Sequence, residues 1–274
     1  METAKSVPAS LPARNLKVAL VAGLRKLVRQ SIVLIGLFLL WEAAPRLGLV
    51  DPAFLPPFTE VVRSLVHLIT SGELLQHFSA SIVRSLTGFL LALIVAIPLG
   101  LIIGWYPTAR ELLNPILELF RNTAALALLP VFMLLLGIGE TSKIAIVLFA
   151  CAWPILLNTI AAVGNVDPLL IKSAKSMKLS SSKLFLKVIL PASVPTIFTG
   201  IRMAGTGAIL VLIAAEMVGA KEGLGYLITY SQYNFEIPKM YAGILAISLL
   251  GLIINYGLVS LERKLSKWNT QTNG

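Results

Sequence analysis

The sequence predicts an all-α integral membrane protein with about six transmembrane helices, a class that both its composition and its apolar runs support. Apolar residues make up 57% of the 274 residues and charged residues only 13%, with a mean hydropathy of +0.85. Soluble domains carry about 25% charged residues, so the composition excludes a soluble globule and a disordered chain. Several apolar runs reach the roughly 20 residues that a helix needs to cross about 30 Å of hydrocarbon.

The first predicted span, over residues 31–47, is the shortest because Glu42 and Arg46 interrupt it. Basic residues before this run and Ala43-Ala44-Pro45 after it also fit a cleaved signal peptide. We favour a retained span, because it gives an even number of crossings with both termini on one side.

Five further runs predict the remaining spans. The second, fourth and sixth contain no charged residue and cover residues 89–106, 144–166 and 241–261. The third and fifth, over residues 112–135 and 188–217, contain two charged residues each.

Basic residues predict the orientation of these spans, since cytoplasmic loops of membrane proteins are enriched in Lys and Arg. With the N-terminus inside, the inner segments hold fifteen Lys and Arg residues and the outer connections hold six. We therefore expect both termini in the cytoplasm. The net charge of +10 then belongs to the inner loops and does not indicate a nucleic-acid-binding face.

The inner loop over residues 167–187 is the most informative segment between spans and holds five lysines. We expect a short amphipathic helix over residues 167–177, a turn over residues 178–182, and a second helix that enters the membrane through Leu190-Pro191. A basic helix of this kind can lie on anionic lipid headgroups. It can equally form a docking surface for a soluble partner.

Charged residues within the third span are candidates for a translocation path, because such residues are unfavourable in hydrocarbon and usually face a cavity or a partner. Arg121 lies nine residues beyond Leu112, or about 14 Å along a helix, and therefore near mid-depth. Its guanidinium can lower the barrier for an anion. Glu118 lies three residues earlier on the same helical face and can simply neutralise Arg121, which is the alternative we favour.

Charged and small residues in the other spans have less specific meanings. Arg202 follows the inner interface by a turn or two, so its side chain can snorkel to the cytoplasmic surface. Glu216 lies about 21 Å further along the helix, near the outer mouth, where it can line a gate or cap a neighbouring helix. Gly100 and Gly104 permit close helix packing. We favour packing within the bundle over packing at a dimer face.

Catalytic and metal-binding patterns are missing from the sequence. It contains no Gly-x-x-x-x-Gly-Lys-Ser/Thr loop that could hold ATP phosphates, so any ATP must bind to a partner protein. His67 and His77 lack the spacing of metal ligands, and no Gly-x-Ser-x-Gly nucleophile motif occurs. We therefore expect no catalytic residue, metal or cofactor in this chain, and no enzyme activity of its own.

The 167–187 loop resembles the EAA loop of permeases in ATP-binding-cassette (ABC) importers. That pattern consists of Glu-Ala-Ala, three residues, Gly, nine residues, an aliphatic residue, one residue and Leu-Pro. It falls here on Lys172-Ser173-Ala174, Lys178, Val188 and Leu190-Pro191. Because Lys172 and Lys178 replace the Glu and the Gly, we expect the negative charge and the sharp turn to be missing.

Segments between Phe54 and Leu261 resemble the sulfonate, taurine and nitrate branch of the same permease family. In that branch a proline-rich run follows the Arg of the third span; residues 121–128 lack it here, so we expect weaker kinking. The segments that carry the resemblance are Phe54-Leu-Pro-Pro57, Asn114-Pro115, Leu129-Pro130, Gly137-Ile-Gly-Glu-Thr-Ser-Lys143, Ala214-Ala-Glu216-Met217 and Gly223-Leu-Gly225.

This resemblance implies the fold of an ABC type I importer permease with a cytoplasmic coupling loop. The implied organisation is a cytoplasmic segment over residues 1–28, the first span and a periplasmic connection over 29–74, the permease domain over 75–262, and a cytoplasmic tail over 263–274. The implied partners are a second permease subunit, giving a homodimer, two ABC ATPase subunits that bind ATP and Mg, and a periplasmic substrate-binding protein.

The implied function is the import of a small anionic solute across the bacterial inner membrane by alternating access. Sulfonate or taurine is the favoured substrate, with nitrate or bicarbonate as alternatives and an ion-coupled secondary transporter as the rival class. The residues expected to couple to the ATPase are Lys172, Ser173, Ala174, Lys175, Met177, Lys178 and Leu179. The residues expected to line the translocation path are Glu118, Arg121, Asn122, Thr123, Arg202 and Glu216.

Overall fold

The computed structural model describes residues 32–265 and contains only helices, turns and loops over that range. The predicted cytoplasmic segment 1–28 and most of the predicted tail lie outside the described residues. The chain divides into two compact units, residues 1–63 and residues 64–274, and each unit is described by itself.

The first unit contains a helix over residues 32–46, which lies within the first predicted span. This helix is shorter than the roughly 20 residues that a crossing requires, and the chain before it lies outside the described part. The Glu42 carboxylate accepts a hydrogen bond of 2.9 Å from the backbone N–H of Thr59. This bond stabilises the first turn of α2 (Phe58–Thr70), because a carboxylate at a helix N-terminus satisfies a free N–H group.

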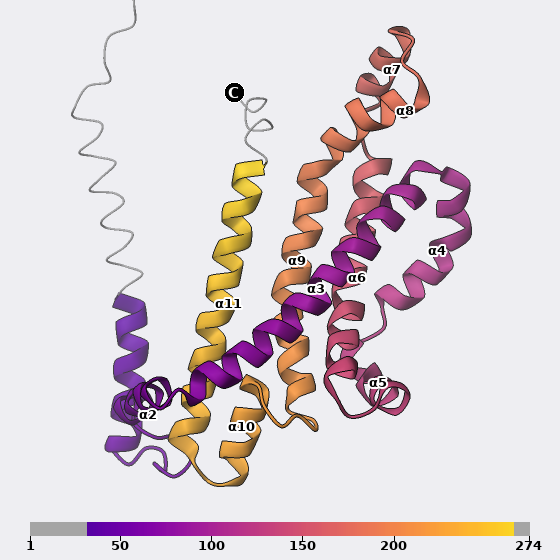
Figure 1. Ribbon diagram of the computed structural model, residues 1–274. Coiled ribbons are helices and arrows are strands. Elements are labelled where there is room, and N and C mark those ends of the chain that lie inside the picture. Colours follow the sequence, from indigo (N-terminus) through magenta and orange to yellow (C-terminus); the bar gives the residue numbers. More distant parts are fainter. Residues whose placement is uncertain (1–31, 266–274) are drawn as a thin grey trace, which may run out of the picture. The chain divides into compact units, whose positions relative to one another are not determined.

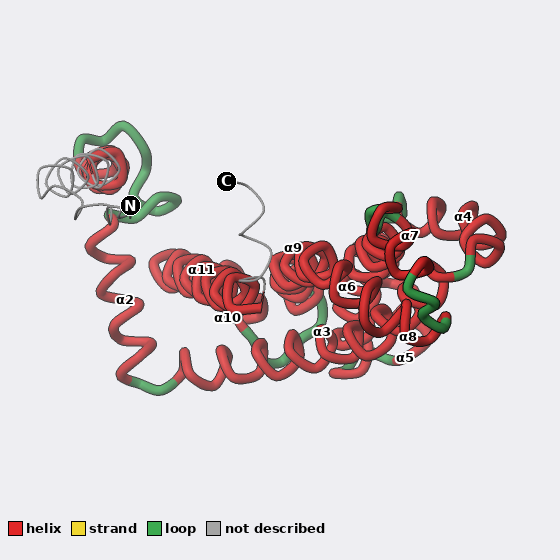
Figure 2. The backbone as a smooth tube through the Cα atoms, turned by 90° about the horizontal axis from the view of Figure 1, so that it is seen from above, coloured by secondary structure: helices red, strands yellow, loops and turns green. Residues whose placement is uncertain are grey.

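The second unit contains four long apolar helices, of which three lie side by side and α3 crosses them obliquely, packing on α6 and α9 (Figures 1 and 2). They are α3 (Glu73–Trp105), α6 (Glu140–Gly164), α9 (Leu190–Glu216) and α11 (Ile237–Leu265). Each is long and apolar enough to cross a membrane, α9 together with the short helical segments before it. The fourth, fifth and sixth predicted spans lie on α6, α9 and α11. The second predicted span is part of α3, which begins sixteen residues earlier than predicted.

The core lies between α3, α6 and α9, where small residues allow the helices to approach closely. A Cβ atom at Gly100 would lie 2.6 Å from the Cβ of Thr159, and one at Gly104 would lie 2.8 Å from the Cβ of Val163. Both contacts are too short for a real side chain, so α3 and α6 need glycine at these positions. The two glycines therefore serve packing within the bundle, as favoured above.

The third predicted span is broken, which corrects the expectation of one continuous and weakly kinked helix over residues 112–135. The first half is α4 (Pro107–Arg121); the second half, residues 125–136, comprises a 3₁₀ turn (Ala125–Leu128) and α5 (Leu129–Leu136). The two halves are bent by 84°. The predicted weak kink is wrong because other residues replace the missing prolines at the break.

Side chains at the break satisfy the last carbonyl groups of α4. The Asn122 amide donates to the Glu118 carbonyl oxygen at 2.8 Å, and the Thr123 hydroxyl donates to the Leu119 carbonyl oxygen at 3.0 Å. Pro130 then stands in the first turn of α5, where its missing N–H group is not needed. Residues 32–265 thus hold four continuous candidate spans, or five if the bent pair is one span.

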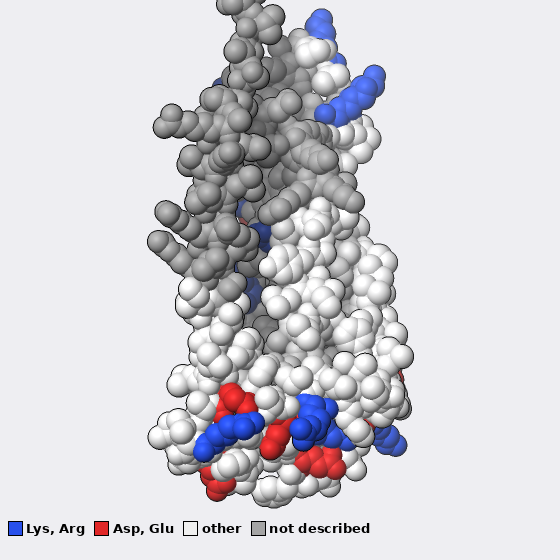
Figure 3. Space-filling view, turned by 90° about the vertical axis from the view of Figure 1, so that its left-hand side faces the viewer, with Lys and Arg blue, Asp and Glu red and all other residues white. Residues whose placement is uncertain are grey.

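Short helices occupy the two ends of the bundle in the second unit. Figure 1 shows α7 (Pro168–Ser176) and α8 (Ser181–Leu184) at one end, and α5 and α10 (Leu224–Tyr233) at the other. A π-helical turn over Phe185–Ile189 joins α8 to α9. In Figure 3, charged side chains of the described residues are visible at the lower end and at the upper tip, and few are visible on the white surface between them. This distribution fits a helical protein whose middle faces hydrocarbon.

Candidate translocation and coupling sites

The segment over residues 167–189, which we call the elbow, connects α6 to α9 and contains α7 and α8. Asp167 caps α7, since its side chain accepts a hydrogen bond of 2.8 Å from the N–H of Leu169. The helix, the turn and the second helix that the sequence predicts here are all present, and the second helix continues through Leu190 into α9.

Lys178 forms the sharp turn that was expected to be missing. Its φ angle is +56°, in the left-handed region that favours glycine. The N–H of Lys178 donates to the carbonyl of Lys175 at 2.9 Å, and the N–H of Leu179 donates to the carbonyl of Ala174 at 3.3 Å. This pair of bonds is a Schellman motif, which commonly ends helices with glycine at the left-handed position. The turn is therefore kept with a lysine in a strained conformation.

The seven predicted coupling residues have different exposures. Ala174 is buried in a small apolar cluster with Val163 and Ile189, and Leu179 packs against that cluster. Met177 projects outward with 74% of its surface exposed. The remaining four residues are exposed polar or basic side chains, namely Lys172, Ser173, Lys175 and Lys178. Ala174 and Leu179 can thus pack the elbow against the helix bundle, while the other five residues are available to a partner.

Four of the six residues predicted for the translocation path lie together at the end of α4. Arg121 donates to Glu118 at 3.2 Å, and the two side chains are 60% and 50% exposed. Asn122 and Thr123 follow directly in the break. The pairing favoured from sequence is therefore present, on an open face of the chain.

The other two predicted path residues lie elsewhere. Arg202 donates to Glu262 on α11 at 3.1 Å, an ion pair that joins α9 to α11. Glu216 is buried at the end of α9. Its carboxylate accepts a hydrogen bond of 3.0 Å from the N–H of Gly225 in the first turn of α10. Of the two possibilities raised for Glu216, the structure therefore shows helix capping.

Glu216 also belongs to a polar network that the sequence did not predict. We call it the Arg84 cluster, and it consists of the buried Ser81, Arg84 and Glu216 together with the exposed Glu140. Arg84 is 2% exposed. Its Nη1 donates to Glu216 at 2.8 Å and to the Glu222 carbonyl oxygen at 2.7 Å, and its Nη2 donates to Glu140 at 2.7 Å. Its Nε atom contacts the second oxygen of Glu140.

The Arg84 cluster joins α3, α6, α9 and the loop before α10. Ser81 donates to the Glu216 carboxylate at 2.8 Å and accepts a bond of 2.9 Å from the N–H of Leu224. A Cβ atom at Gly223 would collide with the Glu216 carboxylate, so the loop packs directly on this carboxylate. The available signal was that Arg84 and Glu140 precede predicted spans and Glu216 stands at the end of one, all at the same end of the bundle.

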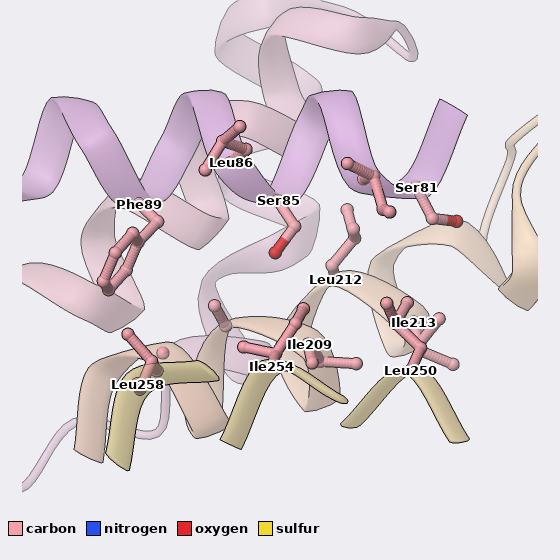
Figure 4. A pocket seen from close by; sticks show the side chains of 13 residues that line it. Ser81, Ser85, Leu86, Phe89, Ile209, Leu212, Ile213, Leu250, Ile254 and Leu258 are labelled. Carbon is pink, nitrogen blue, oxygen red and sulfur yellow. The ribbon is translucent and has the colours of Figure 1, made fainter. Parts of the chain in front are cut away.

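Two cavities in the second unit differ sharply in lining. The first, of about 240 Å³, lies between α3, α9 and α11 (Figure 4). Its walls are almost entirely hydrocarbon side chains such as Phe89, Leu212 and Leu258, so it offers no charge to an ionic solute. The second, which we call the break cavity, has a volume of about 530 Å³ and lies between the break, α6 and α9, with Arg121, Asn158 and Trp153 in its walls.

A further cavity of about 980 Å³ lies between the elbow and the connection from α3 to α4, and Arg110 and Lys175 line it. Residues 32–265 hold no group of three or more His, Cys, Asp and Glu side chains that could bind a metal. His77, one of the two histidines, accepts a hydrogen bond of 3.2 Å from the N–H of Gly223.

Comparison with known proteins places this geometry in context. The family model for the binding-protein-dependent transport system inner membrane component matches residues 96–267. The taurine transport system permease protein TauC of Escherichia coli is 33% identical over 252 residues, which cover 89% of this chain and 92% of TauC. The putative aliphatic sulfonates transport permease SsuC of Bacillus subtilis is 33% identical over 235 residues, covering 86% of this chain and 85% of SsuC.

A third relative and a solved structure complete the comparison. The nitrate import permease NrtB of Leptolyngbya laminosa is 33% identical over 186 residues, which cover 68% of this chain and 67% of NrtB. An inward-facing structure of the MetNI methionine ABC transporter superposes with a TM-score of 0.60 at 17% identity, over 68% of this chain and 93% of that chain. At this identity the structural likeness shows a shared fold alone.

Proposed function

We propose a function for this chain on the basis that it belongs to the family of binding-protein-dependent transport system inner membrane components, in the sulfonate, taurine and nitrate branch of ABC importer permeases. The chain is the membrane-spanning subunit that imports a small anionic solute across the bacterial inner membrane. A sulfonate such as taurine is the favoured substrate, because the relatives named for taurine and aliphatic sulfonates align over more of the chain than the one named for nitrate. Nitrate and bicarbonate are the alternatives.

The observation that carries this proposal is the elbow. Its first helix is short, capped and placed between two spans. Ala174 packs this helix against the bundle, the Lys178 turn ends it, and Met177 is exposed. A rigid helix of this kind can transmit the movement of a soluble partner to α6 and α9. Two states of the partner would then favour two arrangements of the helix bundle. We place it in the cytoplasm, against an ABC ATPase that binds ATP and Mg.

The assembly consists of two copies of this permease, two ATPase subunits and a periplasmic binding protein that delivers the solute. In this arrangement the Arg84 cluster and α10 face the periplasm, and both termini lie in the cytoplasm. The path follows the break, where Glu118, Arg121, Asn122 and Thr123 gather. Arg202 and Glu216 have partners on other helices and support the bundle that forms this path.

The test for coupling replaces Met177 with glutamate in a permease that is co-expressed with its ATPase. We expect Met177→Glu to lower co-purification of the ATPase at least fivefold, because a buried unpaired carboxylate is unfavourable at an interface. Tyr233→Glu is the matched control, since Tyr233 is equally exposed at the opposite end of the bundle. Equal ATPase recovery in both variants would contradict the role of the elbow.

A transport measurement separates this proposal from the rival class. The complete complex in liposomes should take up taurine only with ATP and the binding protein. Uptake by the permease alone, driven by a proton or sodium gradient, would instead support a secondary transporter.

A further inference from the structure

We infer that the break cavity is a transit site for the oxyanion group of the solute, in which Arg121 and Asn158 present hydrogen-bond donors to a sulfonate. This inference rests on the proposed function and names the residues that hold the solute within the membrane. Four independent observations carry it.

The first observation is the depth of the cavity. Trp153 lies near the middle of α6, and Met203 and Gly207 lie near the middle of α9, and all three line the cavity. Because α6 and α9 are both candidate membrane spans, the cavity lies at about half the depth of the bilayer.

The second observation is the break itself. Residues 122–124 leave the helix at this depth, and the side chains of Glu118, Arg121 and Asn122 are exposed beside them. Non-helical backbone and charged side chains do not face hydrocarbon; they are tolerated only where protein or water covers them. This face of the chain therefore borders a wet path or a second permease subunit, and not lipid.

The third observation is the set of polar groups in the walls. Arg121 uses one of its five N–H groups on the exposed Glu118. Asn158 donates one N–H group to the Pro154 carbonyl at 2.8 Å, which leaves its second N–H group free. With these free N–H donors and no carboxylate in its walls, the cavity fits an anion.

The fourth observation is the shape of the cavity. Phe120 stacks on Trp153 with ring centroids 5.0 Å apart, and Phe149 contacts the same ring edge-on at 5.6 Å. The rings of Phe120 and Trp153 both line the cavity and form an apolar wall, and Phe149 supports them from behind. A volume of about 530 Å³ lies within the usual size of small-molecule sites, so a short aliphatic sulfonate fits with room for water.

The sharpest test fills the cavity at Gly207. A Cβ atom at this helical position meets nothing within 4 Å, so a larger side chain can enter the cavity without a clash. We expect the series Gly207→Ala, Gly207→Val and Gly207→Leu to lower ATP-driven taurine uptake step by step, to below a tenth for leucine. Gly251→Leu on α11 is the matched control, because Gly251 is also helical and open but does not line the cavity, and it should change uptake less than twofold.

A second set of variants tests the donors. Arg121→Gln and Asn158→Leu should each lower the maximal uptake rate at least fivefold, with little change in the half-saturating concentration, which the binding protein sets. Arg121→Lys should restore at least a third of the rate by keeping the charge. Asn234→Leu is the control for Asn158→Leu, since Asn234 makes the same bond to the carbonyl four residues earlier, at 2.9 Å.

The outcomes separate the two proposals. If the unsubstituted complex takes up neither taurine nor alkanesulfonates, the proposed function and this inference are both overturned. Normal uptake in the unsubstituted complex, with the Gly207 series and the donor variants indistinguishable from their controls, would overturn the inference alone. Yield of the assembled complex is measured for every variant, and a lowered rate at full yield supports the site.

Discussion

Arg84 and Arg121 each bind a carboxylate, and their surroundings are opposite. Arg84 is buried and bonded to two carboxylates and a backbone carbonyl that come from three other parts of the chain. Arg121 is 60% exposed and bonded to Glu118, three residues earlier on the same helix. The first arginine therefore links elements of the fold, whereas the second leaves most of its N–H groups open to a ligand.

This contrast teaches that a charged residue in or beside a membrane-spanning helix does not by itself identify a functional site. Removing one partner of a buried ion pair leaves an uncompensated charge in a medium of low dielectric constant. An exposed pair at helical spacing contributes little to stability because water screens it. An anion can thus compete for Arg121, while Arg84 has no surface on which an anion could bind.

The largest expected effect comes from Arg84→Met. This variant leaves the Glu216 carboxylate buried without its cation, and we expect the free energy of unfolding to fall by about 3–5 kcal/mol. Thermal unfolding of the purified permease in detergent, or its yield if it does not fold, measures the loss. Arg121→Met serves as the control, and an equal loss of stability in both variants would break the comparison.

A smaller effect is expected from Glu216→Gln. The amide keeps a similar shape but loses the charge and turns N–H groups toward donors, so we expect a loss of about 1–3 kcal/mol. Glu140→Gln removes a second carboxylate paired with Arg84, but that side chain is 60% exposed, so water screens the lost charge. In detergent, the free energy of unfolding of Glu216→Gln should therefore be clearly lower than that of Glu140→Gln. The reverse order would contradict the burial of Glu216.

Lys178 tests a backbone effect separately from a charge effect, because its left-handed conformation is unfavourable for any side chain whatever its charge. Lys178→Gly should stabilise the elbow by about 1 kcal/mol, since a non-glycine residue in the left-handed region is strained. Lys175→Gly removes the same charge inside α7 and should destabilise by about 1 kcal/mol. Hydrogen exchange of the elbow amides measures both changes. Equal effects of the two variants would mean that the lost charge, and not the backbone conformation, determines the stability of the elbow.

The smallest expected effect is that of Glu118→Gln. Because the Arg121–Glu118 pair is exposed, the free energy of unfolding should change by less than about 1 kcal/mol. The same unfolding assay checks this value. A loss comparable with that of Arg84→Met would show that the pair holds the break together.

The long spans and the elbow could be predicted from the sequence because both depend on local patterns. Runs of apolar residues locate α6, α9 and α11, and the polar segment that ends at Leu190-Pro191 locates the helices and the turn of the elbow. The break after Arg121 could not be predicted from the absence of prolines, because Asn122 and Thr123 satisfy the helix end instead.

The Arg84 cluster could not be predicted because it depends on contacts between distant residues. Glu216 lies 132 residues beyond Arg84 in the chain, and no spacing in the sequence reports their contact. The early start of α3 has a related cause: polar residues such as Glu73, His77 and Arg84 interrupt the apolar residues of its first turns, so these turns do not extend the apolar run. The left-handed Lys178 escaped prediction because propensity alone places glycine there.

The π-helical turn between α8 and α9 has a consequence for insertions and deletions. A π-helical turn accommodates one residue more than an α-helical turn, and one residue corresponds to about 100° of rotation around a helix axis. Deletion of a single residue within Phe185–Ile189 would restore regular winding and rotate α7 about the axis of α9. Met177 would then point in a new direction, so the length of this five-residue segment sets the heading of the whole elbow.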